Sequence, residues 1–187
     1  QDDQYRLARN KIKVENDKEF NSGQLNKYLK QNKGLGWSPF LYVYNWTNGN
    51  GGVWDRFVQK IGKAPVVYSP EQVDNSISNI KDHLEYIGYY GSDVRSEIKV
   101  KKRKVTVIYN VSLGKRYPIK EIALKLPKRG EFTEAFLADT SLFTIKTGDF
   151  LSEQSLEAET ESLASIMRNK GFYDFSKNNF FFEADTV

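Results

Sequence analysis

The chain has 187 residues, of which 39% are hydrophobic, 28% charged and 14% aromatic, with a formal net charge of +4. This composition favours a packed core over global disorder, and no apolar run is long enough for a membrane-spanning helix. The lack of cysteine excludes disulfides, thiol nucleophiles and cysteine-ligated metals, and the single histidine, His83, excludes a histidine-rich metal centre.

Charge is distributed unevenly along the chain. Residues 1–130 carry 24 Lys/Arg and 13 Asp/Glu, a net charge of +11, whereas residues 131–187 carry 4 and 11, a net charge of −7. An anionic partner such as a membrane surface, nucleic acid or an acidic protein explains the basic part. Solvated turns, and lysines that protect sheet edges from pairing, are the alternative explanation.

The first expected elements are a strand and a short helix. Ile12 and Val14 alternate with charged residues, which predicts a half-buried strand. Ser22 is the expected cap of a short helix whose apolar face includes Leu25 and Leu29.

An aromatic-rich insert, residues 34–67, follows the short helix. Its rings either form a contact surface for a ligand or pack onto the domain's own core and enlarge it. The candidate contact residues of this insert are Trp37, Phe40, Tyr42, Tyr44, Trp46, Trp54 and Phe57.

Residues 69–88 predict a long amphipathic helix. Ser69 is the expected N-cap, Pro70 begins the first turn, and Gly88 suits the left-handed position after the last turn. His83 lies beside the apolar stripe and is expected to be a boundary residue rather than a general base, because no catalytic constellation can be assigned around it. The stripe, at spacings of three and four, consists of Val73, Ile77, Ile80, Leu84 and Ile87.

Two strands are expected next. Apolar residues alternate in 94–100 and again in 105–111, which predicts a hairpin with a basic turn at residues 101–104. The order of elements to this point is strand, helix, helix, strand, strand.

The same order begins again 83 residues later. This offset aligns Ser69 with Ser152 and Gly88 with Gly171, the start and end of a second long helix. In this copy a strand is expected at 122–126, a short helix after Thr133, and another strand within 174–184. A third strand would begin where the sequence stops, so we expect the chain to be a fragment. The sequence thus predicts an α+β fold of two tandem β-α-α-β-β units, 5–116 and 117–187, the second lacking its last strand.

Three segments mark the helix ends and the exit of the repeated unit: LEYIGYYGSDV at 84–94, LGKRYPIKEI at 113–122 and IMRNKGFYDFSKNNFFFEADT at 166–186. In these segments the unit resembles the POTRA (polypeptide-transport-associated) domain, which stands in tandem ahead of the outer-membrane barrel in the BamA/TamA family of assembly factors. The insert segment YNWTNGNGGVWDRFVQKIGKAPVVYSPEQ, residues 44–72, is similar to one in TamA-like proteins of the Bacteroidetes type, called TamL.

The resemblance implies a non-catalytic fragment on the periplasmic face of the outer membrane. It implies a downstream β-barrel, a lipid-carrying cysteine upstream of Gln1, and unfolded outer-membrane protein clients or a periplasmic protein as partners, with no cofactor or metal. In the family the second strand of a unit lies at the sheet edge, where an extended polypeptide can pair with it by β-augmentation. The implied inter-unit hinge comprises Gly114, Tyr117 and Pro118. The implied polypeptide-binding edge comprises Val94, Arg95, Ser96, Glu97, Ile98, Lys99 and Val100.

Two other interpretations stay open at this point. The basic residues of the edge strand either leave pairing possible or protect the edge against it. The alternative function is a nucleic-acid-binding module that uses the basic hairpin and the aromatic residues, although the acidic second half argues against it. An enzyme is not expected, because no phosphate loop, metal cluster or triad spacing occurs.

Overall fold

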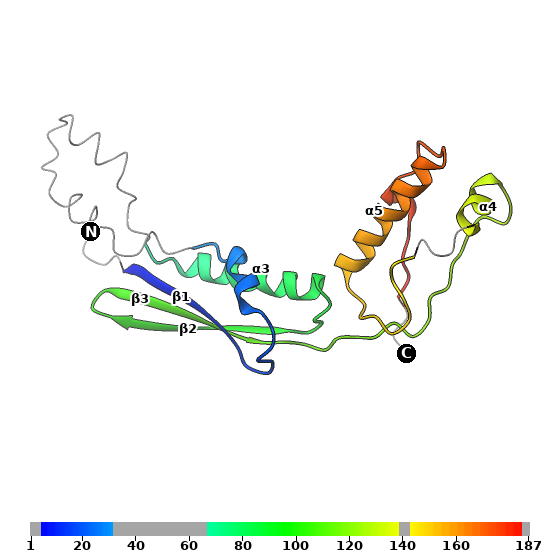
Figure 1. Ribbon diagram of the computed structural model, residues 1–187. Helices are drawn as coiled ribbons and strands as arrows, with labels where there is room; N and C mark the ends of the chain where they lie inside the picture. The colour runs from blue at the N-terminus through cyan, green and yellow to red at the C-terminus, as the bar shows by residue number, and fades with distance from the viewer. Residues whose placement is uncertain (1–4, 32–66, 139–142, 185–187) are drawn as a thin grey trace, which may run out of the picture. The chain divides into compact units, whose positions relative to one another are not determined.

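The computed structural model describes residues 5–31, 67–138 and 143–184 (Figure 1). Its elements in chain order are β1 (Arg6–Val14), η1 (Ser22–Tyr28), α3 (Pro70–Tyr86), β2 (Asp93–Lys101), β3 (Lys104–Ser112), α4 (Glu131–Leu137), α5 (Glu153–Asn169) and η3 (Lys177–Asn179). The α+β class expected from the sequence is confirmed. The chain divides into two compact units, one made of Gln1–Asp82 and Ser92–Leu113, the other of His83–Gly91 and Gly114–Val187.

The strands of the first unit form one sheet in the order β1-β3-β2. β1 runs parallel to β3, and β2 runs antiparallel to β3 in register from Asp93↔Ser112 to Lys101↔Lys104. A parallel pair cannot be joined by a tight turn, so the chain leaves β1, forms η1, α3 and β2, and only then returns as β3. α3 lies along one face of the sheet (Figure 1).

The core of the first unit lies between α3 and this face. Alternate residues of β3, from Val105 to Val111, are at most 1% exposed, and Ile80 of α3 is 0% exposed. Burial of each of these side chains stabilises the fold by roughly 1.5–3 kcal/mol. The strand at 11–15, the long helix and the hairpin predicted from the sequence are all present.

The buried stripe of α3 differs in detail from the expected one. Ser76 and His83 are buried, whereas Ile77 and Ile87 are only half-buried. Ile77 lies at the flank of the stripe, and Ile87 follows the last residue of α3. The buried face of α3 therefore includes polar side chains that the hydrophobic periodicity did not predict.

The turn between β2 and β3 consists of two residues, Lys102 and Arg103, with φ of 48° and 57°. Positive φ at both central residues is the geometry of a type I′ turn, which matches the twist of the flanking strands. Asn-Gly adopts this geometry more easily than Lys-Arg does, because a β-carbon disfavours the left-handed region.

The second unit is built around α5. Ser152 caps this helix by accepting a hydrogen bond from the Ser155 N–H, as the sequence predicted. The apolar centre of the second unit consists of Phe136 of α4 with Leu163 and Met167 of α5. The half-buried residues packed against this centre are Leu126, Phe132, Ala135, Phe143, Phe172, Phe175 and Phe180.

The two strands expected in this unit do not form. Residues 122–126 and 174–184 hold no strand, and the second segment contains the short η3 instead. A strand needs a neighbour that supplies N–H and C=O groups, and no described segment pairs with either one. Part of their apolar side chains are accordingly exposed, at 43% for Ile122, 48% for Leu124 and 90% for Phe181. Leu126, Phe175 and Phe180 instead pack against the apolar centre of the unit.

Candidate polypeptide-binding edge

β2 lies at an edge of the three-stranded sheet, as the sequence led us to expect. It pairs with β3 on one side, and no described residue pairs with its other side. Val94 is buried at the start of the strand, but Ile98 and Val100 are 46% and 56% exposed. Among the described residues, the outer side of β2 is therefore without a pairing strand, and most of its side chains after Val94 are exposed.

The turn fixes which backbone groups of β2 face outward. A two-residue hairpin closes with its flanking pair, here Lys101 and Lys104, hydrogen-bonded to each other. In an antiparallel ladder hydrogen-bonded and non-hydrogen-bonded pairs then alternate. With the observed register, the N–H and C=O groups of Val94, Ser96, Ile98 and Val100 point away from β3, toward the open side.

The opposite face of β2 carries a row of alternating charges. The Arg95 Nε donates to Asp93 Oδ2 at 2.7 Å, and Lys99 Nζ lies 3.1 Å from Glu97 Oε1. Hydrogen bonds from Lys81 and then from Arg95 hold the pKa of Asp93 below its usual value. These cations are thus matched along their own strand, which weakens the interpretation that their charge repels a pairing strand.

The expected hinge residues lie in a hydrogen-bonded segment of the second unit. Tyr117 is 5.7 Å from Tyr90 between ring centroids, its carbonyl accepts from the Leu151 N–H at 2.8 Å, and Pro118 bridges to Phe150. Gly114 immediately precedes this segment. Their role as a hinge stays a prediction.

Arg116 of the same segment lies over two aromatic rings. Its guanidinium lies 5.1 Å from the ring centroid of Tyr89 and 4.1 Å from that of Phe150, within range of cation–π attraction. Gly88 approaches the Leu151 carbonyl so closely that a β-carbon would lie 2.5 Å from its oxygen. Gly88 also has a φ of 93°, so only glycine fits here without strain.

The aromatic insert is the second contact surface that the sequence suggested. All seven of its candidate contact residues, Trp37, Phe40, Tyr42, Tyr44, Trp46, Trp54 and Phe57, lie outside the described residues.

Sequence reasoning missed two buried polar positions that match across the repeat. Ser76 of α3 accepts a hydrogen bond from the Lys30 N–H at 2.9 Å. Glu159 of α5, 83 positions later, is 3% exposed and accepts from the N–H groups of Thr144 at 3.1 Å and Ile145 at 3.3 Å. Each long helix thus holds the chain segment before it by the same device. The offset aligns the two positions, but neither serine nor glutamate is typical of a core, so no signal in the sequence indicated their burial.

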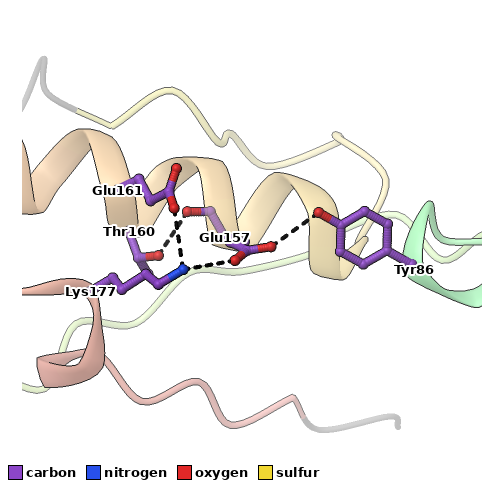
Figure 2. A network of polar contacts seen from close by, with 5 residues as sticks. All are labelled: Tyr86, Glu157, Thr160, Glu161 and Lys177. Atoms are coloured by element: carbon purple, nitrogen blue, oxygen red, sulfur yellow. Dashed lines mark hydrogen bonds and ion pairs between the residues drawn. The ribbon is translucent and has the colours of Figure 1, made fainter. Parts of the chain in front are cut away.

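A polar network on α5 was also missed (Figure 2). The Lys177 Nζ lies 3.0 Å from Glu157 and 3.2 Å from Glu161, and the Tyr86 hydroxyl donates to Glu157 at 3.1 Å. The hydrogen bond from Lys177 is the main cause of a lowered Glu157 pKa. The same pairing raises the pKa of Lys177. The charged side chains of this network are exposed, so the network suits local stabilisation rather than catalysis.

Comparison with known proteins places this sheet in a family. The profile described as "POTRA: Surface antigen variable number repeat" matches residues 9–114, more than half of the chain. The chain belongs to the POTRA family. The match covers both the hairpin and α3, so the resemblance stated from the sequence is confirmed at the level of the POTRA domain. A search of curated proteins found no match.

Among solved structures, the chain is similar to one POTRA structure. It is the crystal structure of Haemophilus influenzae BamA POTRA3-5, with 13% sequence identity and a TM-score of 0.37. The alignment covers 91% of this chain and 52% of that one, so this chain spans about half the length of the matched structure.

Among the described residues no group of His, Asp and Glu could hold a metal ion, and no helix is long and apolar enough to cross a membrane.

Proposed function

We propose that this chain is the periplasmic part of an outer-membrane protein assembly or translocation factor of the BamA/TamA type. It acts without catalysis, by binding extended segments of unfolded outer-membrane proteins or of a periplasmic partner. Membership in the POTRA family supports this proposal. The TamL subtype, the downstream barrel and the tandem arrangement of two POTRA units belong to the same proposal. The comparisons do not favour the nucleic-acid-binding alternative.

The observation that carries the proposal is the free edge of β2. Four of its residues direct their backbone groups outward, and a polypeptide laid along the edge can satisfy them as a fourth strand. Backbone pairing reads little of the client's sequence, which suits clients of many sequences. The exposed Ile98 and Val100 offer apolar contact to alternate side chains of that strand.

Proline substitution separates backbone pairing from side-chain contact. Ile98→Pro removes an outward donor and leaves the bonds between β2 and β3 intact. Ile98→Ala is the matched control, because it removes the same side chain and keeps the N–H. Titration of the full chain with a barrel-strand peptide of alternating sequence should show about a tenfold weaker affinity for Ile98→Pro than for Ile98→Ala.

The outcome that would overturn the proposal is equally specific. Equal affinities for the two variants would mean that the backbone donor of Ile98 is not used. A peptide that shifts only NMR signals of residues 34–67 would make the aromatic insert the binding site.

A further inference from the structure

The tip of the β2–β3 hairpin concentrates cations that the client-binding edge does not use. Four consecutive basic residues, Lys101, Lys102, Arg103 and Lys104, are all exposed. In the described part of the chain none of them forms an ion pair. Arg6 is a fifth basic residue at this end of the sheet, because it pairs with Lys104 and its backbone N–H donates to the Arg103 carbonyl at 3.0 Å. We call these five residues the basic tip.

Exposed aliphatic side chains lie next to the basic tip. Ile98 and Val100 share a strand face with Val94, yet they are 46% and 56% exposed whereas Val94 is 3% exposed. The core face of β2 therefore becomes an open apolar surface as the strand approaches the turn. A short segment that combines aliphatic groups with unpaired cations is typical of contact with a bilayer interface.

The turn itself is not the one that folding alone favours. Lys102 and Arg103 both have positive φ, at 48° and 57°, where Asn-Gly would be less strained. Strained backbone that is kept in place is commonly found at functional sites. Here the strained positions carry the two outermost charges of the hairpin.

We propose that the basic tip and the adjoining Ile98 and Val100 dock on the surface of a bilayer that contains anionic phospholipids. The cations meet lipid phosphates, and the two aliphatic side chains enter the headgroup region. Nucleic acid fits this surface less well, because residues 98–104 contain no aromatic ring on which a base can stack. This docking uses side-chain charge at the turn, so it goes beyond the backbone pairing proposed for the β2 edge.

The test exploits the strained turn. The double variant Lys102→Asn/Arg103→Gly removes two charges and installs the preferred type I′ sequence, so the hairpin should be at least as stable as before. Lys11→Gln/Lys13→Gln is the matched control, because it removes two exposed charges from β1 of the same sheet. Binding of the unmodified chain and of each variant to vesicles with equal parts of phosphatidylcholine and phosphatidylglycerol is measured by co-sedimentation.

The expected result is selective loss of vesicle binding. Each cation near an anionic surface changes affinity about fivefold, so the turn variant should bind roughly 25-fold more weakly, with a melting temperature no lower than that of the unmodified chain. The control variant should lose less vesicle affinity than the turn variant. Vesicles of phosphatidylcholine alone should bind neither variant. Equal losses for the two variants, equal binding to both kinds of vesicle, or binding to an oligonucleotide in preference to vesicles would overturn the proposal. None of these results bears on peptide pairing at β2.

Discussion

Glu159→Ala should strongly destabilise the second unit while the stability of the first is unchanged. The substitution leaves the buried N–H groups of Thr144 and Ile145 and the Thr144 hydroxyl without their acceptor. Each orphaned donor costs about 1–3 kcal/mol, and the lost side chain leaves a cavity. Three orphaned donors therefore give an expected loss of at least about 3 kcal/mol, a large part of the 5–15 kcal/mol typical of a small domain.

Two further variants make this prediction sharp. Glu159→Gln keeps an acceptor oxygen and should cost only about 1–2 kcal/mol. Ser76→Ala removes the matching acceptor of the first unit, and should destabilise that unit by about 1–3 kcal/mol without affecting the second. Amide exchange resolved by residue, in increasing denaturant, reports each unit separately. If Glu159→Ala left the protection of α5 unchanged, the carboxylate would not hold residues 144–145, and the shared device would be refuted.

The fold and the polar network lead to further expectations. Ile80→Asp should destabilise the first unit by about 3–5 kcal/mol, because it places an unpaired charge at a site that is 0% exposed; an unchanged thermal midpoint would contradict the packing of α3. Lys177→Met should raise the titration midpoint of Glu157 in carboxyl NMR, since Lys177 is the main cause of its lowered pKa. Because that pKa is lower in the folded chain, the pair's contribution is complete above the usual glutamate pKa and is lost as pH falls through the folded value. An unmoved midpoint would exclude the ion pair in solution.

Much of the first unit could be predicted because its elements have clear periods. The alternation in 105–111 and the three-and-four spacing in 73–84 each fit one kind of element and one buried face. The exact set of buried residues on α3 could not be predicted. Ser76 is buried and accepts a hydrogen bond from the backbone N–H of Lys30, which is distant in the sequence. The burial of Glu159 could not be predicted either, because a charged residue is normally expected at the surface.

The second unit shows where such reasoning fails. Alternation in 122–126 and 174–184 reports that a segment is suited to a strand, but not that a partner strand is there to pair with it. The left-handed turn at Lys102 and Arg103 was also beyond reach, because neither residue is a usual turn former. The position of β2 at the edge came from the family resemblance, and the sheet order agrees with it.

The most direct test of the central claim is amide hydrogen exchange along β2 with and without a bound barrel-strand peptide. The amides of Arg95, Glu97 and Lys99 already face β3 and should keep their protection. Those of Ser96, Ile98 and Val100 face outward and should gain protection only when the peptide is bound. A gain with this period of two would establish a fourth strand on the edge. Saturating peptide that produced no gain, or the same gain at every residue of β2, would contradict pairing at this edge.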